Sequence, residues 1–118
     1  MLTKSELRLA SIRGTADGRP CDPAVIVSQM GRMTVAGISG GRIVAIATPK
    51  GEKCGVLLPI AGGRAVEVVL AWDDTYTVRR VRLVTRGKEA GTVVVESETV
   101  GVYFDELSEV AWSASCWK

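Results

Sequence analysis

The chain has 118 residues, of which 47% are hydrophobic and 24% are charged, and its formal net charge is +2. This length and composition are those of one globular domain that is large enough to bury a core, so residues 1–118 are treated as a single domain. The small net charge excludes a protein that binds nucleic acid over its whole surface, and any basic site must therefore be local.

The residue content also limits the chemistry. No histidine occurs, which removes the commonest general base and metal ligand. Cys21, Cys54 and Cys116 are far apart and form no metal-binding or redox motif, so we expect reduced thiols in a cytoplasmic protein. Charged residues interrupt the first apolar positions, and no run approaches the roughly 20 apolar residues of a membrane span. We expect no signal peptide, no membrane contact, no cofactor, no metal site and no enzymatic activity.

A helix is predicted over residues 3–13. Thr3 is suited to cap its N-terminus, Glu6 follows at the spacing of a capping box, and Gly14 is suited to follow its last turn. Lys4 and Arg8 lie one turn apart on this helix. One face of the predicted helix is therefore basic.

The next part of the chain is predicted to be β-rich. β-Branched, alternating or apolar runs favour strands over about 24–29, 32–39, 42–48 and 54–58. Gly40 and Gly41 can both take a positive φ, as a tight two-residue turn requires. We therefore expect the second and third of these strands to pair as a hairpin.

Residues 64–72 are predicted as either a helix or a strand. Three valines and the following Asp73-Asp74 pair favour a strand. The apolar side chains also recur at helical spacing, at Ala65, Val68, Val69 and Trp72. The residues alone leave this choice open.

The C-terminal part is predicted to form three strands and a tail, over about 76–85, 92–96, 99–104 and 105–118. Arg79, Arg80 and Arg82 lie on the first of these strands, where charge is expected to protect a sheet edge from unwanted pairing. In the tail, Trp112 and Trp117 are expected to pack in the core or over a sheet edge, with a contact surface as the alternative.

The order of these elements resembles a single domain of the bacterial DNA sliding clamp, the ring-shaped processivity factor of the replicative polymerase. Residues 31–40 occupy the place of the family's strand of the form gly-x-leu-thr-leu-x-ala-thr-asp-gly. Leu57-Leu58-Pro59 stands before residues 64–72 as valine-proline stands before the family's second helix, and Phe104-Asp105-Glu106 resembles its closing segment. The similarity spans residues 2–110.

This sequence also departs from the family pattern. Ser39 stands where the family usually has aspartate, and Asp105 stands where proline normally follows the phenylalanine. A clamp subunit has three such domains, whereas this chain has the length of one. The family's peptide-binding pocket forms between two domains, so none of its residues can be placed on this chain.

The resemblance implies an α+β fold in which two helices pack on one side of antiparallel sheets, with residues 64–72 as the second helix. It also implies a non-enzymatic protein that self-associates into a homo-oligomer and contacts duplex DNA without sequence specificity, in replication processivity or DNA tethering. The DNA-contacting residues that it suggests are Lys4, Arg8, Arg13 and Arg64. A solvated basic surface is the alternative explanation of the same residues.

A second hypothesis is a small protein-interaction module on the same fold. Its partner would be a replication or regulatory protein, bound through an exposed strand edge or through the segment that holds Trp112 and Trp117. The two hypotheses differ in assembly, because a ring needs two complementary sheet edges on each chain and a binding module does not.

Overall fold

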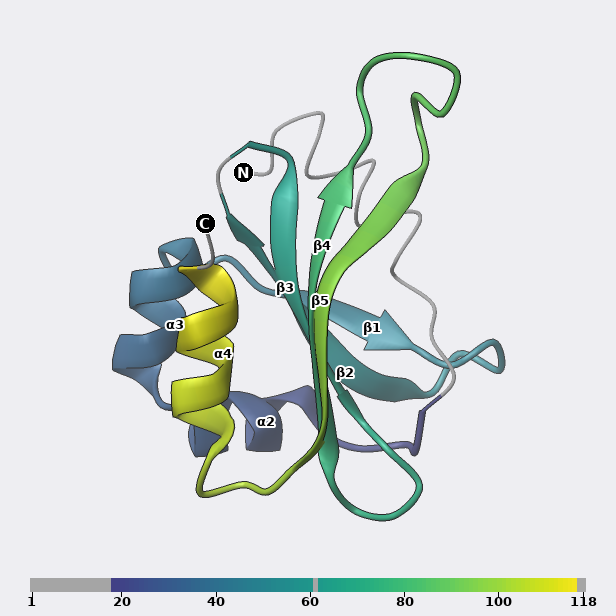
Figure 1. The fold of residues 1–118 in the computed structure, drawn as a ribbon. Coiled ribbons are helices and arrows are strands. Elements are labelled where there is room, and N and C mark those ends of the chain that lie inside the picture. The colour runs from purple at the N-terminus through teal and green to yellow at the C-terminus, as the bar shows by residue number, and fades with distance from the viewer. Residues whose placement is uncertain (1–17, 61, 117–118) are drawn as a thin grey trace.

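The structure is a computed structural model, and it describes residues 18–60 and 62–116. One antiparallel sheet of five strands carries the described helices on one face (Figure 1). The predicted α+β class is therefore confirmed, with a single sheet in the described residues. The helix predicted over residues 3–13 lies outside them.

The elements follow one another along the chain with short connections. The helices are α2 (Pro23–Met30), α3 (Arg32–Ser39) and α4 (Leu107–Ser115). The strands are β1 (Val44–Ala47), β2 (Lys53–Ile60), β3 (Arg64–Leu70), β4 (Tyr76–Leu83) and β5 (Val93–Val102). Each strand pairs with the next, so β1 and β5 are the two edges of the sheet within the described part of the chain.

The main core lies between the helices and the sheet. The helices contribute buried apolar side chains that include Ile26, Met30, Val35, Leu107 and Ala111. The sheet contributes Val56, Leu58, Val66, Val68 and Val78 from its three central strands. Burial of these apolar surfaces is the main driving force that holds the helices on the sheet.

A second cluster of buried side chains covers the opposite face of the sheet. It consists of Ile46, Cys54, Leu57, Ala65, Val69, Val81 and Leu83. The central strands are therefore buried on both faces, which explains the nearly continuous apolar run of β2.

The strand predicted over residues 24–29 is wrong, because these residues form most of α2. The Asp22 side chain accepts a hydrogen bond from the Ala24 N–H at 2.9 Å, and Pro23 occupies the first helical turn. Ile26 and Met30, four residues apart, are fully buried. The N-cap and the burial of one helical stripe outweigh the β-branched composition of the segment.

The strand predicted over residues 32–39 and its hairpin are also wrong, because these residues form α3. The Gly40 N–H donates to the Ala36 carbonyl at 2.9 Å, and this glycine ends the helix in the left-handed conformation. Gly40 and Gly41 do have positive φ, at 66° and 87°. The positive φ values therefore belong to the end of a helix. Met33 is 87% exposed whereas Val35 is buried, although both would lie on one face of a strand.

The segment that the sequence left open between helix and strand is a strand, because residues 64–70 form β3. Six consecutive residues of β2 pair with them in register, from Gly55 opposite Val69 to Ile60 opposite Arg64. Gly62 and Gly63, both with positive φ, lie in the turn between the two strands. The helix that the clamp resemblance implied for this segment is therefore wrong.

The end of the chain also differs from the prediction. The two strands expected over 92–96 and 99–104 form one strand, β5, because Ser97 and Glu98 pair with β4 instead of turning, and only the register shifts at Glu96. The expected tail contains α4. Strands do form within the predicted ranges 42–48, 54–58 and 76–85, at β1, β2 and β4, although β2 extends beyond its range at both ends.

Gly55 allows β2 and β3 to approach closely. A methyl group at this position would lie 2.3 Å from the Val68 carbonyl oxygen and 3.0 Å from the Val69 Cα, both of which are backbone atoms. We predict that Gly55→Ala lowers the free energy of unfolding by about 2–4 kcal/mol, measured by urea denaturation. Gly87→Ala is the control.

At Gly87 an added methyl group meets nothing within 4 Å, so this control carries only the strain of its positive φ, about 1 kcal/mol. Equal effects of the two variants would contradict the importance of close strand packing at Gly55.

Candidate functional site

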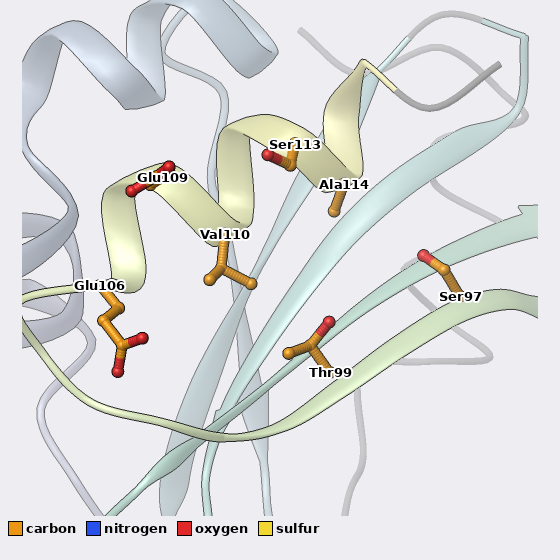
Figure 2. A pocket seen from close by; sticks show the side chains of 7 residues that line it. All are labelled: Ser97, Thr99, Glu106, Glu109, Val110, Ser113 and Ala114. Atoms are coloured by element: carbon orange, nitrogen blue, oxygen red, sulfur yellow. The ribbon is translucent and has the colours of Figure 1, made fainter.

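The candidate site is a groove between α4 and the edge strand β5, with a volume of about 440 Å³. Its lining residues are Ser97, Thr99, Glu106, Glu109, Val110, Ser113 and Ala114. Figure 2 shows Val110 and Ala114 projecting from the helix toward the sheet, with Ser97 and Thr99 on the opposite wall. The groove thus has an apolar strip on the helix and hydroxyl groups on the strand.

The position of α4 is fixed at both ends. Leu107 in its first turn and Ala111 one turn later are completely buried in the main core. At its last turn, the Arg80 Nη1 atom on β4 donates to the Ala114 carbonyl oxygen at 3.0 Å. A cation against the last carbonyls of a helix also complements the helix dipole. One wall of the groove is therefore held rigidly against the sheet.

Three arginines share the carboxylate of Glu96. The Nε atoms of Arg64 and Arg80 lie 3.1 and 3.0 Å from its Oε1 atom, and the Nε atom of Arg82 lies 3.0 Å from Oε2. Burial raises the pKa of Glu96, but hydrogen bonds from the three guanidinium groups outweigh it, and the pKa is lowered overall. The cluster ties β3, β4 and β5 together beside the end of α4.

The helix wall of the groove is acidic. Glu106, Glu109 and Ser113 follow one another at intervals of three and four residues, so they lie along one stripe of the helix. Neither glutamate forms an ion pair with another residue in the described ranges 18–60 and 62–116. Both carboxylates are exposed and available to a cationic ligand.

The strand wall of the groove is a sheet edge. Among the described residues β5 pairs with β4 alone, so its outer backbone groups face away from the sheet. The register shifts near Glu96 and again between Thr99 and Val102, where Gly101 has a φ of 67°. Ser97, Glu98 and Thr99 lie in regular register between these two irregularities.

The residues that the sequence suggested do not gather at this groove as a set. Lys4, Arg8, Arg13 and Trp117 lie outside the described residues. Arg64 begins β3 and binds Glu96, so it does not lie on a helix as the resemblance implied. Trp112 lies on α4, is 47% exposed, and packs against Gly37 of α3.

The expectation that Arg79, Arg80 and Arg82 protect a sheet edge is wrong. They lie on β4, which has β3 on one side and β5 on the other. Arg79 donates to the fully buried Glu67 at 2.8 Å and to Glu98 at 2.6 Å, on the face opposite the helices. These arginines bind carboxylates of neighbouring strands.

The described part of the chain contains few other groups from which a catalytic or metal site could be built. No disulfide joins any two of the three cysteines, and the described residues contain no group of histidine, cysteine and acidic side chains that could hold a metal ion. Asp73 accepts hydrogen bonds from Thr75, and Asp74 forms an ion pair with Arg19. None of the described helices has the length and apolar character needed to cross a membrane.

Sequence reasoning recognised the acidic residues after Phe104 but missed the groove. The spacing of Glu106, Glu109 and Ser113 is a helical signal that was open to detection. The pairing of Glu96 with arginines on two other strands has no such signal, because it depends on the register of the sheet.

Comparison with known proteins adds nothing to the assignment: no protein-family model, curated protein or solved structure matches this chain.

We predict that Glu96→Gln lowers the free energy of unfolding at pH 7 by about 2–4 kcal/mol, because three guanidinium groups lose a largely buried partner. The folded-state pKa of Glu96 lies below its ordinary value of 4.5. The carboxylate therefore stabilises the fold above pH 4.5, and this contribution is lost as the pH falls through the lowered value. Chemical denaturation at several pH values measures both effects.

The control is Glu89→Gln, which changes an exposed carboxylate in the β4–β5 loop. The difference between wild type and Glu96→Gln is expected to shrink as the pH falls below 4.5, and Glu89→Gln is expected to resemble wild type throughout. A difference that stays constant down to pH 2 would contradict a lowered pKa at Glu96.

Proposed function

We propose that this chain is a non-enzymatic protein-interaction module whose partner docks in the α4–β5 groove. The observation that carries the proposal is the groove itself, which lies beside a sheet edge with no strand partner among the described residues. Folded domains commonly bind peptide segments at an exposed strand edge beside a groove, because the edge supplies backbone hydrogen bonds and the groove receives side chains. The partner class that we propose is a replication or regulatory protein.

The lining residues favour binding over catalysis. They provide two carboxylates, three hydroxyl groups and two apolar side chains, with no cysteine, lysine or histidine among them. Nucleophiles and general bases in enzymes are usually activated by a neighbouring group of that kind. A groove that combines an apolar strip with hydroxyl groups and exposed charges is instead typical of a recognition surface.

The groove can be tested with a photo-reactive amino acid at Thr99 on its strand wall. In cells of the source organism, we predict cross-linking to one discrete protein partner. Ser113→Trp, which fills the opposite wall, is expected to reduce this cross-link at least about tenfold by steric exclusion. Mass spectrometry of the cross-linked band identifies the partner, and blotting measures the yield.

The matched control is Ser28→Trp, on the exposed surface of α2, away from the groove. This control is expected to keep the full cross-link. The absence of any discrete product at Thr99, or equal loss with both tryptophan variants, would contradict docking in the groove.

The DNA-binding, clamp-like role is a second proposal. Arg64 and Arg82 have side chains about one-third exposed, at 34% and 38%, and the cluster holds three arginines against one glutamate. This excess of positive charge supports weak contact with phosphate groups. The strand at residues 64–70 makes this proposal the weaker one, because it removes the helix through which Arg64 would face a DNA channel.

The clamp-like role predicts that the double variant Lys4→Glu with Arg8→Glu weakens nonspecific duplex binding, since both changes replace a cation with an anion. Fluorescence anisotropy with a labelled duplex at low salt measures this effect. Circular dichroism checks that the variant is folded, and light scattering is expected to give the mass of a closed homo-oligomer. Unchanged duplex binding, or a monomer at every concentration, would contradict a ring on DNA.

A further inference from the structure

We propose that the segment docked in the α4–β5 groove is an extended, basic peptide. Its backbone pairs with β5 over Ser97–Thr99, and its lysine or arginine side chains lie against Glu106 and Glu109. This inference rests on the proposed function and specifies the chemistry of the partner.

The strand edge favours an extended peptide. Among the described residues no strand pairs with the outer backbone groups of β5. An added strand can hydrogen-bond to these groups, whereas a helix cannot because its own backbone groups are paired internally. Between the two register shifts, only Ser97, Glu98 and Thr99 offer a regular edge. The paired part of the peptide is therefore short, about three or four residues, and its length is about 10–14 Å.

The charge of the helix wall favours a basic peptide. Glu106 is the N-cap of α4 and Glu109 lies in its first turn; both line the groove, and both are exposed. Within the described ranges neither has a cationic partner, whereas Glu67, Glu96 and Glu98 are each paired with arginine. A cation from the partner would supply the missing charge complement and exclude acidic segments.

The apolar strip on the helix favours apolar residues among the other side chains of the docked peptide. Val110 and Ala114 project toward the sheet and leave a strip between the acidic stripe and the strand (Figure 2). Successive side chains of an extended peptide point to opposite sides. A peptide in which basic residues alternate with aliphatic residues therefore offers one side to the groove and the other to solvent.

A second copy of this chain fits the groove less well. The other sheet edge in the described residues is β1, which has only four residues, Val44–Ala47. None of these residues is charged, so β1 brings no cation to Glu106 and Glu109. Charge complementarity therefore favours a separate basic segment over edge-to-edge association of two chains.

The experiment uses two fluorescein-labelled hexapeptides, one alternating lysine with valine and one alternating glutamate with valine. By fluorescence anisotropy, the lysine peptide is expected to bind the full chain with a dissociation constant of about 10–100 µM at low salt, and the glutamate peptide at least about tenfold more weakly. Glu106→Gln with Glu109→Gln is expected to weaken binding of the lysine peptide about tenfold. The matched control, Glu52→Gln with Glu89→Gln, removes the same charge from exposed turns outside the groove and is expected to bind like wild type.

Amide chemical shifts locate the bound peptide. The expected result is a set of shifts concentrated at Ser97–Thr99 and along α4. Shifts centred elsewhere, equal binding of the two peptides, or equal loss in the two double variants would overturn the inference, and so would dimerisation of the chain through β5.

The outcome also separates this inference from the proposed function. Suppose that Ser113→Trp blocks the Thr99 cross-link to a protein partner while the peptides show no preference for positive charge. The proposal that a partner docks in the groove is then supported, and the inference that this partner is basic is wrong. If neither the cross-link nor the peptide shifts involve the groove, both proposals fail.

Discussion

The position of the last helix beside the sheet edge depends on how a buried cation between the helix and the sheet is paired. Arg80 is only 6% exposed, and its guanidinium group binds Glu96 through Nε and the end of α4 through Nη1. An unpaired charge at such a position would cost free energy. The strand register must therefore place Glu96 beside Arg80, and the length of α4 must bring its last carbonyl groups within hydrogen-bond distance of the same side chain. The same pairing holds α4 beside β5. The groove between them is therefore a consequence of how the core is closed.

The edge strand β5 is partly protected from pairing with other strands and partly open to it. Register shifts near Glu96 and before Val102 interrupt the ladder, and such irregularities discourage uncontrolled pairing between sheet edges. The regular stretch Ser97–Thr99 faces the groove, where acidic side chains limit which segments can bind. A short edge beside a charged wall is suited to weak, selective recognition of an extended segment, which is the physical basis of the proposed function.

Prediction from the sequence succeeded where one signal dominated and failed where two signals competed. The segments of β2 and β4 form strands because each contributes buried apolar side chains to both faces of the sheet. The segment Pro23–Met30 has a strand-like composition, but Asp22 caps a helix and two residues four apart enter the core. The clamp resemblance rested on element order, and it assigned a helix to residues 64–72, of which residues 64–70 form β3. At the candidate site, the sequence shows the helical spacing of Glu106 and Glu109. The opposite wall is β5, and no local pattern in the sequence reveals that this strand lies beside α4.

The sequence by itself determined the positions of several strands, at β1, β2 and β4, because apolar and β-branched runs are local properties. It also determined positive φ at Gly40 and Gly41, since glycine takes this conformation at little cost. Only the tertiary structure decided that these glycines end a helix and that Glu96 joins arginines from two other strands. The tertiary structure also decided that α4 lies along β5. These features depend on contacts between residues far apart in the chain, and their energies exceed the small differences in local propensity that separate a helix from a strand.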